Sequence, residues 1–244
     1  MNVGLKLRAM LRKAGLDIGR WPRPHDEFVL DGALAAVIRA KLVNCVFDVG
    51  ANVGQFGRRV RATGYTGRIV SFEPSESALA ILRRVVAGDN EWVIRPVGLG
   101  SEPGTARMHM YAASDFNSLH APTDAGRSGF TALAEVGTAT VTLSTLAAEH
   151  AAAVAGIVQP RILLKSDTQG HDLEVLAGDP GLPDVVAVLM ELSAEAIYEN
   201  QPRMTTAIDA LQAQGFSPVC FQPVSRAKDR LCVIEFDGLF MRPG

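Results

Sequence analysis

Short runs of apolar residues recur along the chain, separated by stretches in which apolar positions return every three or four residues. Such runs are typical of strands buried on both faces of a parallel sheet, and the stretches between them are typical of helices packed on that sheet. The strands predicted in this way are 45–48, 68–72, 92–97, 161–166 and 185–192, and the helices are 31–42, 55–63, 75–86, 144–155, 172–177 and 202–215.

Strands and helices alternate with short connections, which implies right-handed crossovers and a parallel sheet with helices on both faces. Two further strands, 216–221 and 231–240, are joined by a short polar segment of the length that an antiparallel pair permits. The chain is therefore predicted to form a doubly wound α/β fold. Its seven-stranded, mostly parallel sheet should end in an antiparallel last strand.

The pattern changes between residues 101 and 143. A turn at 101–104 leads into an alternating strand, 105–111, and a second strand follows at 138–143, which suggests a hairpin. The segment 112–130 is rich in Ser, Asp, Asn, Gly and Pro, and a loop of that length inside a compact domain is usually functional or mobile. We expect an insertion over the ligand-binding edge of the sheet.

The N-terminal segment is basic. Residues 1–24 carry six Lys or Arg against one Asp, with apolar residues at helical spacing. A basic amphipathic helix can touch a membrane surface or an acidic acceptor. It can equally pack on its own domain or on a second subunit of a homo-oligomer, and we expect packing because such stripes are most often packing faces. We therefore divide the chain into a basic helix with an extension (1–30) and a main domain (31–244).

Composition narrows the class of protein. With 48% hydrophobic and 20% charged residues, the chain can bury a large core, and a net charge of −2 argues against general nucleic-acid binding. The three cysteines form no C-x-x-C pair, which favours a reduced, cytoplasmic protein. The sequence has no recognisable signal peptide and no apolar run near the roughly 18 residues of a membrane span.

The turn after the first strand is the first candidate site. Asp48 ends the apolar run, and Gly50 and Gly54 flank Asn52 before Gln55 opens a helix whose free amides suit an anionic group. Gly50 can adopt a backbone angle that a side chain penalises, and Gly54 leaves room for a ligand to approach the main chain. The spacing differs from G-x-G-x-x-G, and a carboxylate here repels a pyrophosphate and attracts an ammonium group. We expect an amino-acid tail at this turn.

The second strand ends in Glu73 and Pro74. In doubly wound folds an acidic residue at this place hydrogen-bonds a ribose diol. An amino-acid tail at the first strand and a ribose at the second together describe S-adenosylmethionine. NAD would suit the second strand equally well and the first strand less well.

Three segments carry a resemblance to a known family. Residues 46–54 (VFDVGANVG), 72–74 (FEP) and 164–176 (LKSDTQGHDLEVL) are similar to FkbM-type methyltransferases, and the likeness covers roughly residues 43–240. It implies the Rossmann-like fold of class I methyltransferases, S-adenosylmethionine as cofactor, and methylation of a hydroxyl on a sugar, glycolipid or natural product. It also implies that Asn117 and Ser118 contact either the cofactor or the acceptor, which would be a small molecule or a glycosyl compound.

The catalytic candidates lie at the carboxyl end of the strand 161–166. An alcohol must lose its proton to a side-chain base or after binding a metal. Asp167 is the first candidate, as base or metal ligand, and His171 is the second because imidazole accepts protons near neutral pH. Lys165 could orient Asp167 or the acceptor, although an exposed structural lysine is the commoner case. Glu191 could join Asp167 on Mg²⁺, a weak metal signal.

Two other classes of function stay open. The first is an NAD(P)-dependent sugar oxidoreductase or epimerase, but none of Tyr65, Tyr111 and Tyr198 has the lysine four residues later that the usual proton relay needs. The second is a cofactor-binding scaffold without turnover. A comparison of S-adenosylmethionine and NAD binding distinguishes a methyltransferase from the oxidoreductase. Substitution of Asp167 and His171 distinguishes a catalyst from a scaffold, because a catalyst would keep binding and lose turnover.

Overall fold

The computed structural model describes residues 29–181, 184–227 and 231–243. The basic helix predicted within residues 1–24, with its contact to a membrane or a second subunit, lies outside these ranges. Within them, no helix combines the length and the apolar character that a membrane span requires.

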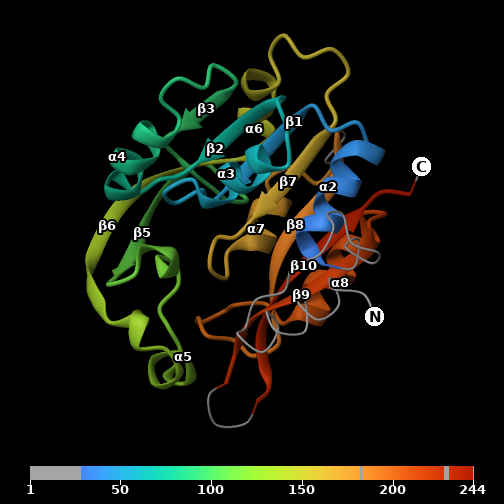
Figure 1. Ribbon diagram of the computed structural model, residues 1–244. Helices are drawn as coiled ribbons and strands as arrows, with labels where there is room; N and C mark the ends of the chain where they lie inside the picture. The colour runs from blue at the N-terminus through green and yellow to red at the C-terminus, as the bar shows by residue number, and fades with distance from the viewer. Residues whose placement is uncertain (1–28, 182–183, 228–230, 244) are drawn as a thin grey trace, which may run out of the picture.

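The main sheet has seven strands and confirms the predicted doubly wound fold (Figure 1). In spatial order the strands are β3 (Trp92–Arg95), β2 (Arg68–Phe72), β1 (Cys45–Val49), β7 (Ile162–Ser166), β8 (Val185–Ser193), β10 (Val233–Met241) and β9 (Ser217–Arg226). The strands β3, β2, β1, β7 and β8 pair in parallel. The strand β10 pairs antiparallel with both of its neighbours, β8 and β9.

Helices cover both faces of this sheet. Alternate side chains of β1 enter different cores: Val46 packs with one set of helices, and Phe47 with the other. The first set is α2 (Leu30–Ala40), α3 (Gln55–Ala62) and α4 (Glu76–Val85), and the second is α6 (Leu146–Ala153), α7 (Asp172–Ala177) and α8 (Met204–Ala213). The carboxyl ends of the parallel strands therefore stay open to ligands at one edge.

The predicted insertion forms a second sheet instead of a simple hairpin. Its order is β4 (Gly98–Leu99), β6 (Glu135–Ser144) and β5 (Gly104–Tyr111), and Figure 1 shows it to one side of the main sheet. The strand β4 was missed because two residues carry no periodicity.

The segment expected to be an irregular loop, 112–130, is partly helical. It contains the 3₁₀ turn η2 (Ser114–Phe116) and the helix α5 (Asp124–Gly129), and a second 3₁₀ turn, η3 (Thr131–Leu133), follows. The Thr123 hydroxyl caps α5 by accepting the Gly126 amide at 3.0 Å. A β-carbon at Gly126 would lie 2.2 Å from the Ile197 carbonyl oxygen. This glycine therefore serves the close approach of α5 to the segment after β8, a tertiary reason that local composition hides.

A row of polar side chains crosses the core beneath the ligand edge. Asp48 lies in register with Ser71 on β2 and Lys165 on β7, so the three share one face of the sheet. Ser71 donates its hydroxyl to Asp48 at 3.3 Å and accepts the Trp92 indole N–H at 2.9 Å. The Lys165 ammonium lies 3.5 Å from the other Asp48 oxygen, so a buried carboxylate and a buried ammonium compensate each other's charge side by side in the main sheet.

Candidate active site

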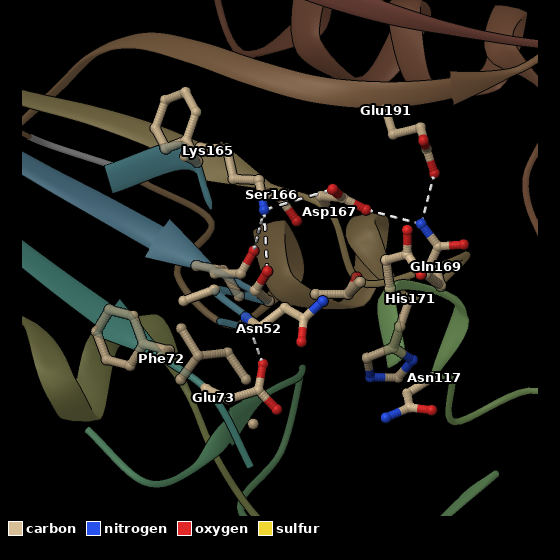
Figure 2. A pocket seen from close by; sticks show the side chains of 18 of the residues that line it. Asn52, Phe72, Glu73, Asn117, Lys165, Ser166, Asp167, Gln169, His171 and Glu191 are labelled. Atoms are coloured by element: carbon tan, nitrogen blue, oxygen red, sulfur yellow. Dashed lines mark hydrogen bonds and ion pairs between the residues drawn. The ribbon is translucent and has the colours of Figure 1, made fainter. Parts of the chain in front are cut away.

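A cavity of about 340 Å³ opens at the carboxyl ends of β1, β2, β7 and β8. Its lining includes Asn52, Glu73, Leu99, Asp167, His171 and Glu191. Its size falls in the range of small-molecule sites, which are about 300–1,000 Å³. The predicted cofactor and catalytic residues are thus largely brought together in one place (Figure 2).

The turn after β1 has the predicted strained backbone. Gly50 has a φ of +70°, and a β-carbon there would lie 2.0 Å from the carbonyl oxygen of Asp167. Only glycine permits this contact between the ends of β1 and β7. Asn52 is also left-handed, with a φ of +46°, and donates its amide to a Glu73 carboxylate oxygen at 2.7 Å. Pro74 and Gln55 also line the cavity.

Two residues of this turn lie elsewhere than predicted. Asp48 is fully buried inside β1 and faces Ser71 and Lys165, so its carboxylate lies below the turn and does not line the cavity. Gly54 also does not line it: with a φ of +84°, its missing β-carbon makes room for Leu82 of α4, at 2.9 Å. Asp48 neutralises Lys165 and Gly54 permits helix packing, two roles that the motif spacing does not distinguish from ligand binding.

Glu73 closes β2 at the predicted ribose position. One carboxylate oxygen accepts the Asn52 amide, and the other accepts the Ser75 amide at 2.8 Å. Burial raises the pKa of Glu73, and the two backbone N–H groups act in the opposite direction by binding the charged form. The carboxylate is held in one orientation, and each oxygen keeps a second lone pair for a ligand hydroxyl.

Lys165 is buried, with 7% exposure, and not the exposed lysine that is commoner. Its ammonium lies 3.5 Å from both Asp48 and Asp167 and donates to the carbonyl oxygens of Val49 (3.2 Å) and Gly50 (3.0 Å). Burial lowers the pKa of Lys165, but the carboxylates outweigh burial and raise it overall. Lys165 is therefore a fixed cation beside Asp167 and cannot act as a base. That it orients Asp167 or the acceptor stays a prediction.

Asp167 reaches the cavity from the end of β7, and its side chain is 39% exposed. One carboxylate oxygen faces Lys165, and the other accepts the Gln169 side-chain amide at 2.8 Å. The carboxylate is thus both accessible to a ligand and fixed at two points, as a positioned acid–base group requires.

His171 lies in the same cavity, just before α7, as predicted from its spacing to Asp167. Its Nδ1 lies 3.3 Å from Nε2 of His120, so one of the two rings donates and the other accepts. Burial, followed by His120, lowers the pKa of His171 to about 4. The imidazole is therefore neutral at physiological pH.

This lowered pKa makes stability depend on pH. Below the ordinary histidine pKa of about 6.5, the unfolded chain binds a proton that folded His171 refuses down to about pH 4. Wild type should therefore lose up to about 1.4 kcal/mol of stability per pH unit over this window, relative to a His171→Asn variant. Urea denaturation of both proteins between about pH 4.5 and about pH 7.5 tests this. A difference between them that does not change with pH would contradict it.

Gln169 was not singled out from the sequence, yet its side chain contacts three other side chains of the site. Its side-chain N–H groups donate to Asp167 at 2.8 Å and to Glu191 at 3.0 Å, and its side-chain oxygen faces the Tyr198 hydroxyl at 3.0 Å. Figure 2 shows it between the two carboxylates. Its position before Gly170, in the turn after β7, is the sequence feature that could have marked it as a site residue.

Asn117 and Ser118 both line the cavity, and both also hold the insertion in place. The Asn117 side chain accepts the Tyr111 amide at 2.9 Å, and the Ser118 hydroxyl donates to the Gln169 carbonyl at 2.7 Å. Their contact with cofactor or acceptor stays a prediction. Arg59 of α3 is a further lining residue that the sequence did not single out.

The predicted Mg²⁺ site finds no support. Among residues 29–181, 184–227 and 231–243, no group of three or more His, Cys, Asp or Glu side chains could hold a metal ion. Glu191 and Asp167 instead share the Gln169 amide, and burial together with the charge of Asp167 raises the pKa of Glu191 well above its ordinary value. Glu191 is a buried carboxyl in the lining of the cavity.

The family is defined by a match over most of the chain. Residues 48–218 match the Methyltransferase FkbM domain, and the protein belongs to this family. It is accordingly an S-adenosylmethionine-dependent methyltransferase, as the three sequence segments predicted. No curated protein matches the sequence significantly.

Solved structures with a similar arrangement are distant in sequence. An rRNA methylase from Streptococcus thermophilus is 9% identical, with coverage of 93% of this chain and 100% of that one and a TM-score of 0.47. The 1,6-didemethyltoxoflavin-N1-methyltransferase of Burkholderia thailandensis, solved with S-adenosylhomocysteine, is 12% identical, with coverage of 99% and 86% and a TM-score of 0.45. Likenesses at this level carry no argument about the acceptor.

The residues present fit the methyl donor. The Glu73 carboxylate, fixed by two backbone amides, has lone pairs left for a ribose diol, and Phe72, Leu99 and Leu143 offer an apolar wall for a purine. The cavity continues past Gly50 to Asp167, which leaves a negatively charged group for the ammonium or for the reacting end. A nucleoside with a charged amino-acid tail suits this order of groups.

The ribose role of Glu73 can be measured directly. Glu73→Gln should weaken S-adenosylmethionine binding about 10- to 100-fold, because hydrogen bonds to charged groups contribute about 1.5–3 kcal/mol. Isothermal titration calorimetry measures the affinity. The matched control is Glu76→Gln, since Glu76 lies three residues on, in the exposed first turn of α4. Equal affinities for the two variants would remove Glu73 from the donor site.

Proposed function

We propose that this protein is an O-methyltransferase that acts on a hydroxyl of a sugar, glycolipid or natural-product acceptor. The observation that carries the proposal is a pair of proton acceptors that line the same cavity as Glu73. Asp167 is a carboxylate paired with a cation, and His171 is a neutral imidazole; both line the cavity. A hydroxyl needs such a base, because it reacts only as its proton leaves.

The charge of the cavity supports a small acceptor in preference to a nucleic acid. Its lining carries three acidic side chains, Asp167, Glu191 and Asp237. Of the two cations in the described lining, Lys165 is paired with two carboxylates and Arg59 with Asp31. Burial and Asp167 raise the pKa of Asp237 to about 6. Phosphate backbones are bound through exposed Lys and Arg, so this lining favours a neutral or cationic group.

The division of labour follows from these contacts. When bound, S-adenosylmethionine would supply an electrophilic methyl group for the acceptor oxygen, and its sulfur would keep the electron pair of the broken carbon–sulfur bond. Lys165 and Gln169 hold the two oxygens of the Asp167 carboxylate in the cavity, and either Asp167 or His171 takes the proton of the hydroxyl. The insertion closes one side, which helps to exclude water, and positioning of this kind contributes roughly 7–11 kcal/mol in favourable cases.

A direct test uses labelled S-adenosylmethionine and a panel of p-nitrophenyl hexosides and deoxyhexosides. We expect label in at least one glycoside, and after alkaline treatment it should remain in a stable ether. Label only in amine-bearing acceptors would replace O-methylation with N-methylation. Saturable binding of NAD without binding of S-adenosylmethionine would favour the oxidoreductase alternative, although the Tyr198 hydroxyl is already engaged with Phe116 and Gln169.

The place of action is part of the proposal. Cys45 is buried, and Cys232 is an exposed free thiol. An exposed free thiol suits a reducing compartment, so we propose that the protein acts in the cytoplasm.

A further inference from the structure

The proposed function gives the side-chain amide of Gln169 only a contact with Asp167. We propose that Gln169 is a positioning residue: it fixes the Asp167 carboxylate in the orientation needed to receive the acceptor proton, and it holds Glu191 away from that position. The inference rests on the role of Asp167 proposed above.

Asp167 depends on Gln169 for one of its two attachments. Its carboxylate would otherwise be tethered only by Lys165, at 3.5 Å, while its side chain is 39% exposed. The Gln169 amide binds the other oxygen at 2.8 Å. A carboxylate held at both oxygens cannot rotate about its terminal bond without breaking one of these contacts.

The same amide separates two carboxyl groups. Its second N–H binds Glu191 at 3.0 Å, so the two carboxyl groups meet through a shared donor instead of facing each other. Without the donor, the two carboxyl groups would lose their shared partner, and Asp167 could turn toward Glu191 or away from the cavity. Either change removes a ready base from the cavity.

Gln169 is itself rigidly placed. It has a φ of +54° and only 8% exposure, and its backbone carbonyl accepts the Ser118 hydroxyl at 2.7 Å. Its side-chain oxygen faces the Tyr198 hydroxyl at 3.0 Å, and the Asp167 and Glu191 oxygens on the other side require the N–H end of the amide. Ser118 and Tyr198 therefore hold Gln169 in place, and Gln169 in turn holds the Asp167 carboxylate.

The test compares two glutamines of the same region. Gln169→Met keeps the length of the side chain and removes its amide. Gln201→Leu is the control: Gln201 accepts the amides of Ile197 and Tyr198, at 2.8 and 3.2 Å, and donates to Ser193 at 2.5 Å, so it supports the same segment without touching Asp167. Crystal structures of both variants with S-adenosylhomocysteine give the Asp167 side-chain orientation, and turnover is measured on the best glycoside of the panel.

We expect the Asp167 carboxylate to leave its position in Gln169→Met and to keep it in Gln201→Leu. Turnover of Gln169→Met should fall about 10- to 100-fold, with unchanged affinity for S-adenosylmethionine, because small misplacements of reacting groups have effects of this size. Adding Gln169→Met to Asp167→Asn should lower turnover no further, since one residue acts through the other. If Gln169→Met does not fold, Gln169→Glu removes the same donor isosterically.

Other outcomes separate the two proposals. An Asp167 side chain that stays in place in Gln169→Met, or effects of Gln169→Met and Asp167→Asn that multiply, would overturn the positioning role and leave the proposed function intact. Full turnover by Asp167→Asn would instead remove the role of Asp167 on which the inference rests. If no glycoside is methylated, the acceptor class is wrong, and the two crystal structures still decide whether Gln169 positions Asp167.

Discussion

Replacement of Asp167 by asparagine is expected to lower turnover by about 10²- to 10⁴-fold, the usual range for loss of a general base. The substitution keeps the shape of the side chain and an oxygen that can accept the Gln169 amide, now at 2.8 Å from Asp167. It removes the negative charge beside Lys165 and the ability to take a proton. The loss should therefore appear in kcat, while affinity for S-adenosylmethionine by calorimetry changes little.

The matched control for this result is Asp209→Asn. Asp209 lies on the exposed face of α8, so its substitution should leave both turnover and donor affinity unchanged. Full turnover by Asp167→Asn, with a large loss in His171→Ala, would transfer the role of base to the imidazole. A parallel loss of donor binding in Asp167→Asn would mean that the carboxylate serves the amino-acid tail of the donor.

Replacement of Lys165 by methionine should have the largest effect on folding. It leaves Asp48, fully buried in β1, without the ammonium at 3.5 Å. Breaking a buried ion pair by removal of one partner costs about 3–5 kcal/mol. Urea denaturation followed by circular dichroism should give a free energy of unfolding lower by this amount, or show no folded protein at neutral pH.

A second substitution separates the charge from the packing. Asp48→Asn in the Lys165→Met background should restore most of the lost stability, because an uncharged amide no longer needs a cation. In the single variant, the unpaired carboxyl has a folded pKa above its unfolded value, so the penalty should shrink as the pH falls below that folded pKa. A penalty that persists in the double variant and does not vary with pH would show that Lys165 acts by packing alone.

The main sheet was predictable because each of its strands is a short apolar run that ends at a turn. Val185–Ser193 and Ile162–Ser166 are buried on both faces, and sequence of this kind has few other stable uses in a domain of this size. The insertion was less predictable. The helix Asp124–Gly129 has little helical propensity of its own, and it forms because Thr123 caps it and Gly126 fits against Ile197.

Some residues of the candidate site were likewise predictable from the sequence, and others were not. Gly50, Glu73 and Asp167 were recognisable because each marks the end of a parallel strand, where ligands collect in open sheets. Asp48 was misplaced by one position: it lies inside the strand, in register with Lys165, and alternation turns its side chain into the core. Gln169 escaped notice because an uncharged amide has no motif of its own, and its importance lies in partners on β7, β8 and the insertion.

The most direct test of this account is a crystal structure of the protein with bound S-adenosylhomocysteine. We predict that the ribose hydroxyls lie within hydrogen-bonding distance of Glu73 and that the sulfur is directed toward Asp167 and His171. A nucleoside bound outside this cavity, or bound inside it with the ribose away from Glu73, would contradict the account.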